Sequence, residues 1–273
     1  MSSRHSARSL PHAMERVGPW TRGWQASGRI VLLLDFDGTL APIVDHPDGA
    51  AMPTATRAAV RRLSEHPGVY LAVVSGRGLH DARQKVGIRG IAYAGNHGME
   101  IQGAGLDRVH PEAAAARPRL EQVRDDVTRR LTEIPGAIIE DKGLTLSIHY
   151  RLVPRDLVDR VMSTVASSAE KVEGLRLTDG KKVVEVRPDV DWQKGKAVEF
   201  LLENLSPPDG TPIIYIGDDR TDEDAFIALR QRSAGEGVIV AESPPAHTAA
   251  RAFLRSPEEV GELLGILAER APN

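Results

Sequence analysis

A short apolar run that ends in two carboxylates is the feature of this sequence that most constrains its fold. Val31-Leu32-Leu33-Leu34 is followed directly by Asp35-Phe36-Asp37-Gly38-Thr39. A short run rich in branched apolar residues is typical of a strand that is buried on both faces. Open α/β sheets bind their ligands at the carboxyl ends of such strands, so the two acids are expected at a ligand crevice.

Asp35 and Asp37 are two positions apart, which places both side chains on one side of the strand if the strand persists. Gly38 allows the backbone to turn tightly beside a ligand. Two carboxylates so close repel each other unless a cation or a shared proton relieves them, which favours a divalent metal. An acidic turn without a ligand is the alternative, since Asp and Gly are common in turns.

Composition limits the classes of protein to which the chain can belong. Its 273 residues are enough for one large or two modest domains. The net charge of -3 gives no basic field for nucleic acid, and the absence of cysteine excludes disulfides and thiolate chemistry. No apolar run approaches the roughly 18 residues of a membrane span, and residues 1–28 lack the apolar core of a secretion signal. We therefore expect a cytoplasmic protein without membrane contact.

The pattern of strands and helices divides the chain into three parts. Residues 1–28 are polar and carry no strong period, so we expect an N-terminal arm. Strands expected over 30–34, 70–74, 91–94 and 212–216 alternate with helices expected over 53–65, 194–204 and 223–229, which predicts parallel βα units. Between them, helices are expected over 112–134 and 154–172, with hairpin strands that turn at Lys142-Gly143 and Asp179-Gly180.

We therefore predict an α/β fold, in which residues 29–108 and 189–273 form a discontinuous Rossmann-like parallel-sheet core and residues 109–188 form an inserted α+β cap. The linkers, near 103–111 and 187–193, suggest a hinge that opens for exchange and closes to exclude water. Polar and glycine residues follow the other core strands too, as in Ser75-Gly76-Arg77. A shared crevice at the strand ends requires this pattern.

A second acid-rich motif follows the strand predicted over 212–216. It reads Gly217-Asp218-Asp219-Arg220-Thr221-Asp222-Glu223-Asp224. A helix N-terminus explains Glu223 and Asp224, because the helix dipole favours negative charge there. Asp218 and Asp219, directly after the strand, are better placed to face the crevice. With the acids of the first motif they can form an oxygen-rich site for Mg²⁺, a hard cation that often binds beside phosphate.

An anionic substrate needs opposing positive charge, and the sequence offers it at Lys194. A lysine at the start of a helix adds its charge to the N-terminal dipole, so both can meet a phosphoryl group. Lys196 follows on the same predicted helix and is expected to be solvated. Lys142 and the pair Lys181-Lys182 fall in the predicted cap, and the alternative for all of these residues is exposure by chance.

These motifs together resemble a known family. Asp35-Phe36-Asp37-Gly38-Thr39, Ser75-Gly76-Arg77, Lys194 and Gly217-Asp218-Asp219 with Asp222 resemble, in order and spacing, the four motifs of the haloacid dehalogenase superfamily of phosphatases. Within that superfamily, the chain is similar to the trehalose-6-phosphate phosphatases at Gly95-Asn96-His97-Gly98, Glu140-x-Lys142, Arg151, Lys181-x-x-x-Glu185 and Lys194-Gly195-Lys196-Ala197. The likeness extends over residues 30 to 260, so the predicted arm lies outside it.

The resemblance implies a phosphatase that hydrolyses trehalose 6-phosphate to trehalose and phosphate, the last step of trehalose biosynthesis. Asp35 would attack phosphorus and form an aspartyl phosphate. Asp37 would protonate the departing sugar oxygen and then activate water to hydrolyse the intermediate. Lys194 would neutralise charge and help to orient Asp35, because electrostatic stabilisation is the main catalytic resource in phosphoryl transfer.

The same resemblance implies roles for the other core residues. Mg²⁺ would be held by the Asp35 side chain, the Asp37 carbonyl and Asp218, with support through water from Asp219 or Asp222. Phosphoryl oxygens would accept hydrogen bonds from Thr39 and Ser75. Arg77 either serves the site or bridges loops.

The resemblance assigns the choice of substrate to the cap. Charged donors and acceptors suit a polyhydroxylated disaccharide. The implied contacts are Glu140, Lys142, Arg151, Lys181 and Glu185, together with Asn96 and His97 on the core side. The alternative for each cap residue is an exposed strand or hairpin side chain.

The expected partner is a small sugar phosphate, and a monomer is the working expectation. A phosphatase for sucrose phosphate or mannosylglycerate phosphate is an alternative that only the cap residues oppose. A non-catalytic phosphosugar sensor is a second alternative, which Asp37 disfavours because hydrolysis needs it and binding does not. A phosphorylated receiver domain also carries an aspartate at a strand end, but it is much shorter and has no cap.

Overall fold

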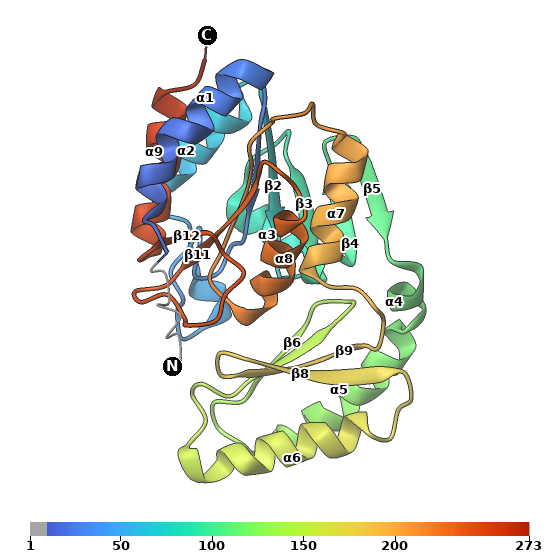
Figure 1. Cartoon of the computed structure of the whole chain (residues 1–273). Helices are drawn as coiled ribbons and strands as arrows, with labels where there is room; N and C mark the ends of the chain where they lie inside the picture. Colours follow the sequence, from blue (N-terminus) through green and yellow to red (C-terminus); the bar gives the residue numbers. More distant parts are fainter. Residues whose placement is uncertain (1–9, 273) are drawn as a thin grey trace, which may run out of the picture.

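The structure is a computed structural model that describes residues 10–272, and it contains two β-sheets (Figure 1). The large sheet has eight strands in the order β12-β11-β10-β1-β2-β3-β4-β5, and the small sheet has four in the order β6-β7-β9-β8. The strands are β1 (Ile30–Leu34), β2 (Val69–Val74), β3 (Ala92–Gly95), β4 (Glu100–Gly103), β5 (Leu106–Val109), β6 (Ile138–Asp141), β7 (Leu146–His149), β8 (Leu175–Gly180), β9 (Val183–Pro188), β10 (Ile213–Gly217), β11 (Gly235–Val240) and β12 (Ala252–Leu254).

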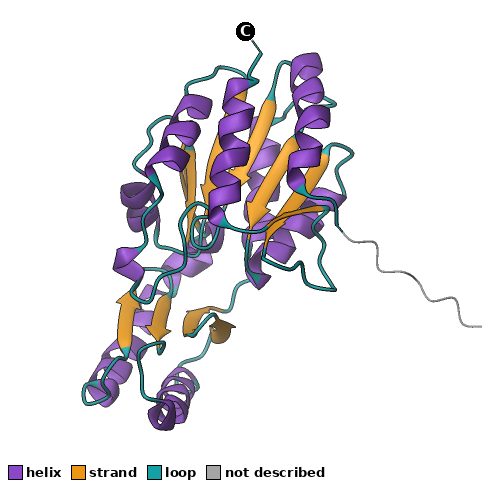
Figure 2. Ribbon diagram, turned by 90° about the vertical axis from the view of Figure 1, so that its left-hand side faces the viewer, coloured by secondary structure: helices purple, strands orange, loops and turns teal. Residues whose placement is uncertain are grey.

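Helices connect these strands and cover the sheets, as Figure 2 shows. The α-helices are α1 (Val17–Ser27), α2 (Thr54–Ser64), α3 (Leu79–Val86), α4 (Pro111–Ala115), α5 (Arg117–Leu131), α6 (Val158–Ala169), α7 (Lys194–Leu205), α8 (Glu223–Arg230) and α9 (Pro257–Glu269). Short 3-10 helices are η1 (Ala13–Arg16), η2 (Pro47–Gly49), η3 (Asn96–Gly98), η4 (Arg155–Leu157) and η5 (Arg220–Asp222). None of the helices within residues 10–272 is both long enough and apolar enough to cross a membrane.

The strand order of the large sheet brings the predicted site segments to one edge. From β12 to β3 the strands run parallel, and β4 and β5 extend the sheet as an antiparallel hairpin. Strand β1 lies between β10 and β2, with Leu34 opposite Ile216 and Val73. The carboxyl ends of these three strands therefore meet, and the residues that follow them lie close together.

Helices on both faces of the large sheet explain why β1 is apolar at every position. Ile30, Leu32 and Leu34 belong to a core shared with α1, α2, α3 and α9, whereas Val31 and Leu33 face α7 and α8. Each of these side chains is almost fully buried, which stabilises the fold by roughly 1.5–3 kcal/mol per large apolar residue. The predicted α/β core with a parallel sheet is confirmed.

The small sheet is antiparallel and has helices on one face. Helices α5 and α6 pack against Ile148, Val184 and Val186, while the alternate residues Ser147 and Glu185 face a cleft between the two sheets. A sheet with one covered face requires this alternation of apolar and polar residues. The predicted hairpins around 137–151 and 175–187 are confirmed as β6–β7 and β8–β9.

The β8–β9 hairpin differs from the prediction in the position of its turn. The sequence predicts a turn at Asp179-Gly180, but β8 continues to Gly180, which pairs with Val183. The turn is Lys181-Lys182, and Lys182 adopts a left-handed conformation with φ 65°. Two-residue hairpin loops commonly require such a conformation. The shift places Lys181 at the hairpin tip, where it faces the large sheet.

The first linker begins later than the sequence predicts. Strand β5 pairs with β4, so most of segment 103–111 is strand and the chain leaves the large sheet after Val109. The chain returns after β9, and Trp192 lies where the two crossings meet. The Arg108 guanidinium lies 4.1 Å from the centre of the Trp192 ring, and the His110 ring lies 5.2 Å from it. These cation–π and ring contacts tie the two crossings together.

Residues 10–28 do not form the arm that the sequence predicts. Helix α1 buries Trp20 and Trp24 in the core on one face of the large sheet, and Trp20 Nε1 donates a hydrogen bond to the buried Glu236 of β11. Two large aromatic side chains bury enough apolar surface to hold a helix that is otherwise polar. The rest of the predicted arm, residues 1–9, lies outside the described residues.

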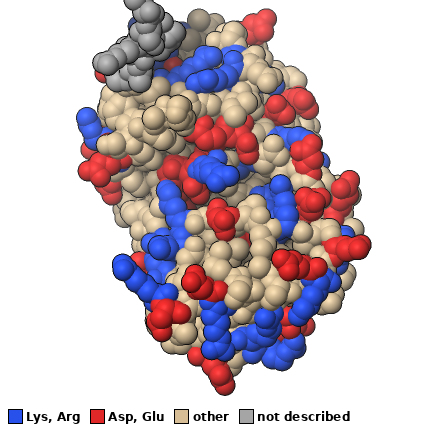
Figure 3. Space-filling model, turned by 60° about the horizontal axis from the view of Figure 1, so that its bottom comes forward, with Lys and Arg blue, Asp and Glu red and all other residues tan. Residues whose placement is uncertain are grey.

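The charged surface is mixed on the face that Figure 3 shows. Lys and Arg side chains are interspersed there with Asp and Glu, and the small-sheet helices carry ion pairs such as Asp126 with Arg129.

Candidate active site

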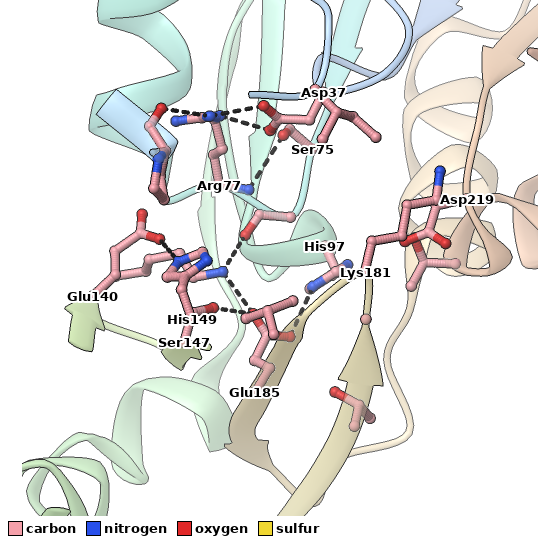
Figure 4. Close-up of a pocket in the computed structure, with 18 of the residues that line it drawn as sticks. Asp37, Ser75, Arg77, His97, Glu140, Ser147, His149, Lys181, Glu185 and Asp219 are labelled. Atoms are coloured by element: carbon pink, nitrogen blue, oxygen red, sulfur yellow. Dashed lines mark hydrogen bonds and ion pairs between the residues drawn. The ribbon is translucent and has the colours of Figure 1, made fainter. Parts of the chain in front are cut away.

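A cleft between the two sheets collects most of the residues that the sequence predicts for the site (Figure 4). Those that line it are Asp35, Asp37, Ser75, His97, Glu140, Lys142, Arg151, Lys181, Glu185, Lys194, Asp218 and Asp219. Thr39, Asn96 and Asp222 are fully buried and do not line it. The cleft therefore combines the carboxyl ends of the large-sheet strands with one wall formed by the small sheet.

Asp35 follows β1 and contacts a buried cation. Lys194, the first residue of α7, has its Nζ 2.9 Å from Asp35 Oδ1 and 2.7 Å from Asp222 Oδ1. Burial raises the pKa of Asp35 well above its ordinary value; Lys194 opposes this shift, and the charge of Asp222 adds to it. Burial disfavours the charge of Lys194, but the two carboxylates raise its pKa, so the ammonium persists.

Asp222 fixes the orientation of Lys194. Its Oδ1 accepts hydrogen bonds from Lys194 and from the Tyr215 hydroxyl at 2.6 Å. Its Oδ2 accepts the backbone N–H groups of Asp218 and Asp219 at 3.0 and 2.9 Å. Four donors satisfy this buried carboxylate, which fixes its position beneath Asp35.

Asp218 completes a group of three acids that could hold a metal ion. Asp35, Asp218 and Asp222 each offer an oxygen, and these oxygens lie within 4.8 Å of one another. Burial raises the pKa of Asp218 to about 6, although the Lys181 ammonium, 2.5 Å from Oδ2, opposes the shift. Gly38 is required beside it, because its φ is 77° and a Cβ would lie 2.1 Å from Asp218 Oδ2. Carboxylate oxygens grouped in this way suit a hard cation such as Mg²⁺.

An arginine pairs with the Asp37 side chain. Arg77 binds the Asp37 carboxylate through two hydrogen bonds, at 2.6 Å from Nε and 2.7 Å from Nη2. Strand β1 ends at Leu34, so the alternation that predicts a common direction for the two acids does not continue to Asp37. Arg77 also donates to Pro47 O, so it both lines the cleft and bridges loops.

Only one of the two hydroxyls predicted to bind a phosphoryl group lines the cleft. Ser75 follows β2, and its Oγ accepts the backbone N–H of Arg77 at 3.2 Å. Thr39 is fully buried, and its Oγ1 has no hydrogen-bond partner within residues 10–272. A buried hydroxyl without a partner costs about 1–3 kcal/mol.

Glu185 joins the two sheets through a buried network (Figure 4). Lys142 Nζ donates to Glu185 Oε1 at 2.6 Å and to Gly76 O at 2.9 Å, and His97 Nε2 lies 2.9 Å from Glu185 Oε2. Burial alone would raise the pKa of Glu185, but Lys142 and His97 lower it well below its ordinary value. Glu185 is thus ionised, and its pairing connects the small sheet to the loop that carries Ser75.

Asn96 belongs to the same junction. The sequence predicts that it contacts the substrate, but it does not line the cleft. Its Nδ2 donates to Lys142 O at 2.9 Å, and its Oδ1 accepts the Thr145 hydroxyl at 2.9 Å. Asn96 and His97 both have positive φ, 48° and 57°, which lets two neighbouring side chains point to different surroundings. As a result, His97 lines the cleft while Asn96 is buried against the small sheet.

Replacing Glu185 by Gln tests the charge of this junction. Because the folded-state pKa is depressed, ionised Glu185 stabilises the fold above its ordinary pKa of 4.5, and this contribution is lost as the pH falls through the folded-state pKa. We expect Glu185→Gln to lower the free energy of unfolding by about 1–3 kcal/mol at pH 7, and the difference from wild type to shrink below pH 4.5. Urea unfolding across this pH range measures it.

The matched control for that experiment is Glu170→Gln, at an exposed position at the end of α6. This control should change stability little at any pH, as surface substitutions usually do. If Glu185→Gln lowers the free energy of unfolding by the same amount at every pH, the charge of Glu185 does not stabilise the junction. The loss would then come from the shape of the side chain or from neutral hydrogen bonds.

The remaining small-sheet residues give the cleft a polar wall with charges of both signs. Glu140 Oε2 lies 2.8 Å from His149 Nε2. Arg151 Nη2 donates to Lys181 O at 3.0 Å, and Arg151 Nε lies 4.0 Å from Asp45 Oδ1. Such a set of donors and acceptors suits a ligand with many hydroxyl groups.

Sequence reasoning missed several residues that line the cleft or support it. His149 and Ser147 alternate along β7 on the face that Glu185 shares, and this period of two is the signal that could have found them. Tyr215 lies within an apolar strand, where nothing marks its hydroxyl as a partner of Asp222. Ile43 and Val44 line the cleft from a loop, and apolar loop residues carry no chemical signal.

A family model described as trehalose-phosphatase matches residues 33–258, a segment that contains all of the cleft residues named above. The chain belongs to the trehalose-phosphatase family. It is 42% identical over 257 residues to a trehalose 6-phosphate phosphatase of Zea mays, which covers 89% of this chain and 70% of that protein. It is 40% identical over 264 residues to a trehalose-phosphate phosphatase of Mycobacterium marinum, which covers 96% of this chain and 66% of that protein.

Solved structures agree with this family assignment. The C-terminal domain of the trehalose-6-phosphate phosphatase of C. albicans superposes with a TM-score of 0.78 at 28% identity, covering 97% of this chain and 99% of that one. A haloacid dehalogenase-like hydrolase from Bacteroides thetaiotaomicron superposes with a TM-score of 0.59 at 18% identity, covering 89% and 99%. The second likeness shows the fold alone, which this chain shares with that haloacid dehalogenase-like hydrolase.

Proposed function

We propose that this member of the trehalose-phosphatase family hydrolyses trehalose 6-phosphate to trehalose and phosphate through an aspartyl-phosphate intermediate. The observation that carries the proposal is the buried pair of Asp35 and Lys194 at the strand ends, opposite a wall of charged residues on the small sheet. Asp35 supplies a carboxylate next to a fixed cation, which suits attack on a phosphoryl group. The polar wall suits the hydroxyl groups of the leaving sugar.

In the first step, an Asp35 oxygen forms a bond to phosphorus while the bond from phosphorus to the sugar oxygen breaks. Asp37 gives a proton to that oxygen, so trehalose leaves as a neutral alcohol. Arg77 occupies both oxygens of the Asp37 carboxylate, so Asp37 must turn away from Arg77 to reach the sugar oxygen. Its carboxylate is 39% exposed, which leaves room for this movement.

In the second step, Asp37 accepts a proton from water, and the water oxygen attacks phosphorus. The bond between phosphorus and the Asp35 oxygen breaks, which releases phosphate and restores the free carboxylate. Lys194 stays protonated throughout and balances the charge of the phosphoryl oxygens together with the N-terminus of α7. Ser75, beside the same site, donates a hydrogen bond to a phosphoryl oxygen.

The acids present fit Mg²⁺. The carboxylates of Asp35 and Asp218 would hold it with the Asp37 carbonyl, while Asp222 would support these ligands from beneath. When bound, the cation would neutralise phosphoryl charge. The raised pKa of Asp35 supports this assignment, because a bound cation would offset the burial and the neighbouring negative charges that disfavour its ionised form. Lys181 now pairs with Asp218, and a cation there would free Lys181 to bind substrate.

We also propose that the small sheet with α5 and α6 acts as a cap that selects the substrate. The Lys181→Ala substitution tests this, since Lys181 reaches from the hairpin tip into the cleft and its side chain is about half exposed. We expect kcat/KM for trehalose 6-phosphate to fall about tenfold or more, and far more than that for a small aryl phosphate. Equal losses on the two substrates would remove Lys181 from substrate selection.

The experiment that tests the function is phosphate release from trehalose 6-phosphate, with and without Mg²⁺, beside a panel that contains glucose 6-phosphate, sucrose phosphate and mannosylglycerate phosphate. Selective, Mg²⁺-dependent release from trehalose 6-phosphate is expected. If the protein prefers another member of the panel, the phosphatase activity would be confirmed but its substrate would be that sugar phosphate. Tight binding of trehalose 6-phosphate without turnover would favour a phosphosugar sensor.

A further inference from the structure

An exposed apolar pair, Ile43 and Val44, lines the cleft from the loop between β1 and α2. Ile43 is 45% exposed and Val44 is 38% exposed, whereas large apolar side chains elsewhere in the described chain are mostly buried. None of the catalytic steps proposed above uses these residues. Exposed apolar surface inside a cleft that is lined mainly by polar and charged residues favours a ligand with an apolar face.

The loop that carries the pair is fixed to the large-sheet side of the molecule. Arg77 Nη2 donates to Pro47 O at 3.0 Å, and Lys85 Nζ donates to Asp48 O at 3.0 Å. Short helix η2 forms part of the same loop. The pair is therefore presented by an anchored segment, which keeps its apolar surface in a defined place.

The opposite wall of the cleft is polar, so the two walls differ in chemistry. Glu140, His149 and Arg151 of the small sheet line that wall. Arg151 approaches Asp45, the residue directly after the apolar pair, at 4.0 Å. The cleft is thus narrow enough for one ligand to contact both walls near this point.

A pyranose ring matches such a cleft, because its hydroxyl groups project from the ring edge and its C–H groups form an apolar face. The groups proposed to handle phosphorus are deeply buried, with Asp35 and Lys194 only 4% and 2% exposed. Ile43 and Val44 are far more exposed, so they lie nearer the mouth of the cleft. In a phosphorylated disaccharide, the ring that does not carry phosphate is the one that extends toward the mouth.

We propose that Ile43 and Val44 form an apolar wall that packs against the C–H face of the unphosphorylated ring, and that this wall selects a disaccharide phosphate over a monosaccharide phosphate. The proposal rests on the proposed function and deepens it. Selection follows because a monosaccharide phosphate reaches the phosphoryl site but leaves the wall uncovered.

The test uses the double variant Ile43→Ala/Val44→Ala in the full-length protein. We expect the ratio of kcat/KM for trehalose 6-phosphate to that for glucose 6-phosphate to fall about tenfold, mainly through KM. A second readout is inhibition of aryl phosphate hydrolysis by free trehalose, whose inhibition constant should rise by a similar factor. The matched control is Ile227→Ala on α8, which is 51% exposed and does not line the cleft.

Each other outcome has a distinct meaning. The proposed role of the apolar wall would be overturned if kcat/KM fell equally for both sugar phosphates, or if the inhibition constant of trehalose did not change. The proposal would also be overturned if the ratio of the two kcat/KM values stayed the same while gel filtration showed a changed oligomeric state. Ile43 and Val44 would then form a contact between copies of the chain. If the wild-type protein releases no phosphate from trehalose 6-phosphate, the proposed function is wrong, and the proposed role of the apolar wall is wrong as well.

Discussion

Asp35→Asn should abolish phosphate release from trehalose 6-phosphate, with a loss of about 10⁴-fold or more, and should leave the fold intact. The amide that replaces the carboxylate has no negative oxygen to attack phosphorus. Lys194 keeps its hydrogen bond to Asp222, so the cation beneath the site remains paired. Phosphate release measured beside the far-ultraviolet circular dichroism spectrum checks both parts of the prediction.

The stability of this variant sharpens the test. Burial raises the pKa of Asp35, so the ionised carboxylate lowers the stability of the folded protein relative to the unfolded chain when no metal is added. We therefore expect Asp35→Asn to melt at the same temperature as wild type or higher. The control is Asp159→Asn, at an exposed position on α6. Activity that survives in Asp35→Asn above about 1% of wild type would assign the nucleophile to another group.

Lys194→Met should lower the free energy of unfolding by about 3–5 kcal/mol and also reduce turnover strongly, because it removes the cation between two buried carboxylates. Methionine keeps the length of the side chain, so the loss reports the charge. The Asp35 and Asp222 oxygens that lie 2.9 and 2.7 Å from Lys194 Nζ would be left facing each other. Urea unfolding with and without Mg²⁺ measures the effect, and added metal should recover part of the stability.

Lys196→Met is the matched control, two positions further along α7. The Lys196 side chain is 36% exposed, compared with 3% for Lys194. An exposed pair such as Lys196 with Asp191 contributes about 0–1 kcal/mol, so this variant should resemble wild type. Similar stability for the two variants would show that the buried position of Lys194 carries no special energetic role.

The sequence predicts best what depends on a buried strand and the residue directly after it. The run Ile30–Leu34 matches β1 at both ends, and Asp35 and Asp218 follow their strands into the cleft as expected. The reason is physical: an all-apolar run can be satisfied only inside a covered sheet, and parallel strands bring their carboxyl ends together. The roles of these residues in catalysis stay predictions.

Side chains beyond the strand ends were harder to predict, because their directions depend on local backbone conformation. Asn96 lies in a left-handed turn and is buried against the small sheet, and Asp37 meets Arg77 because the chain turns after β1. Partners for these side chains come from distant segments, such as Thr145 for Asn96, and a single sequence gives no sign of such pairing. Helix α1 was missed because Gly and Pro obscure its apolar period, although Trp20 and Trp24 anchor it.

The places of the three tryptophans also have a spectroscopic consequence. Trp20 and Trp24 are both in α1, whereas Trp192 lies under Arg108 where the chain crosses between the sheets. With Trp20 and Trp24 replaced by Phe, the remaining indole emission would come from the crossing alone. If the predicted hinge opens and closes, this fluorescence would report the movement of one sheet against the other without any attached dye.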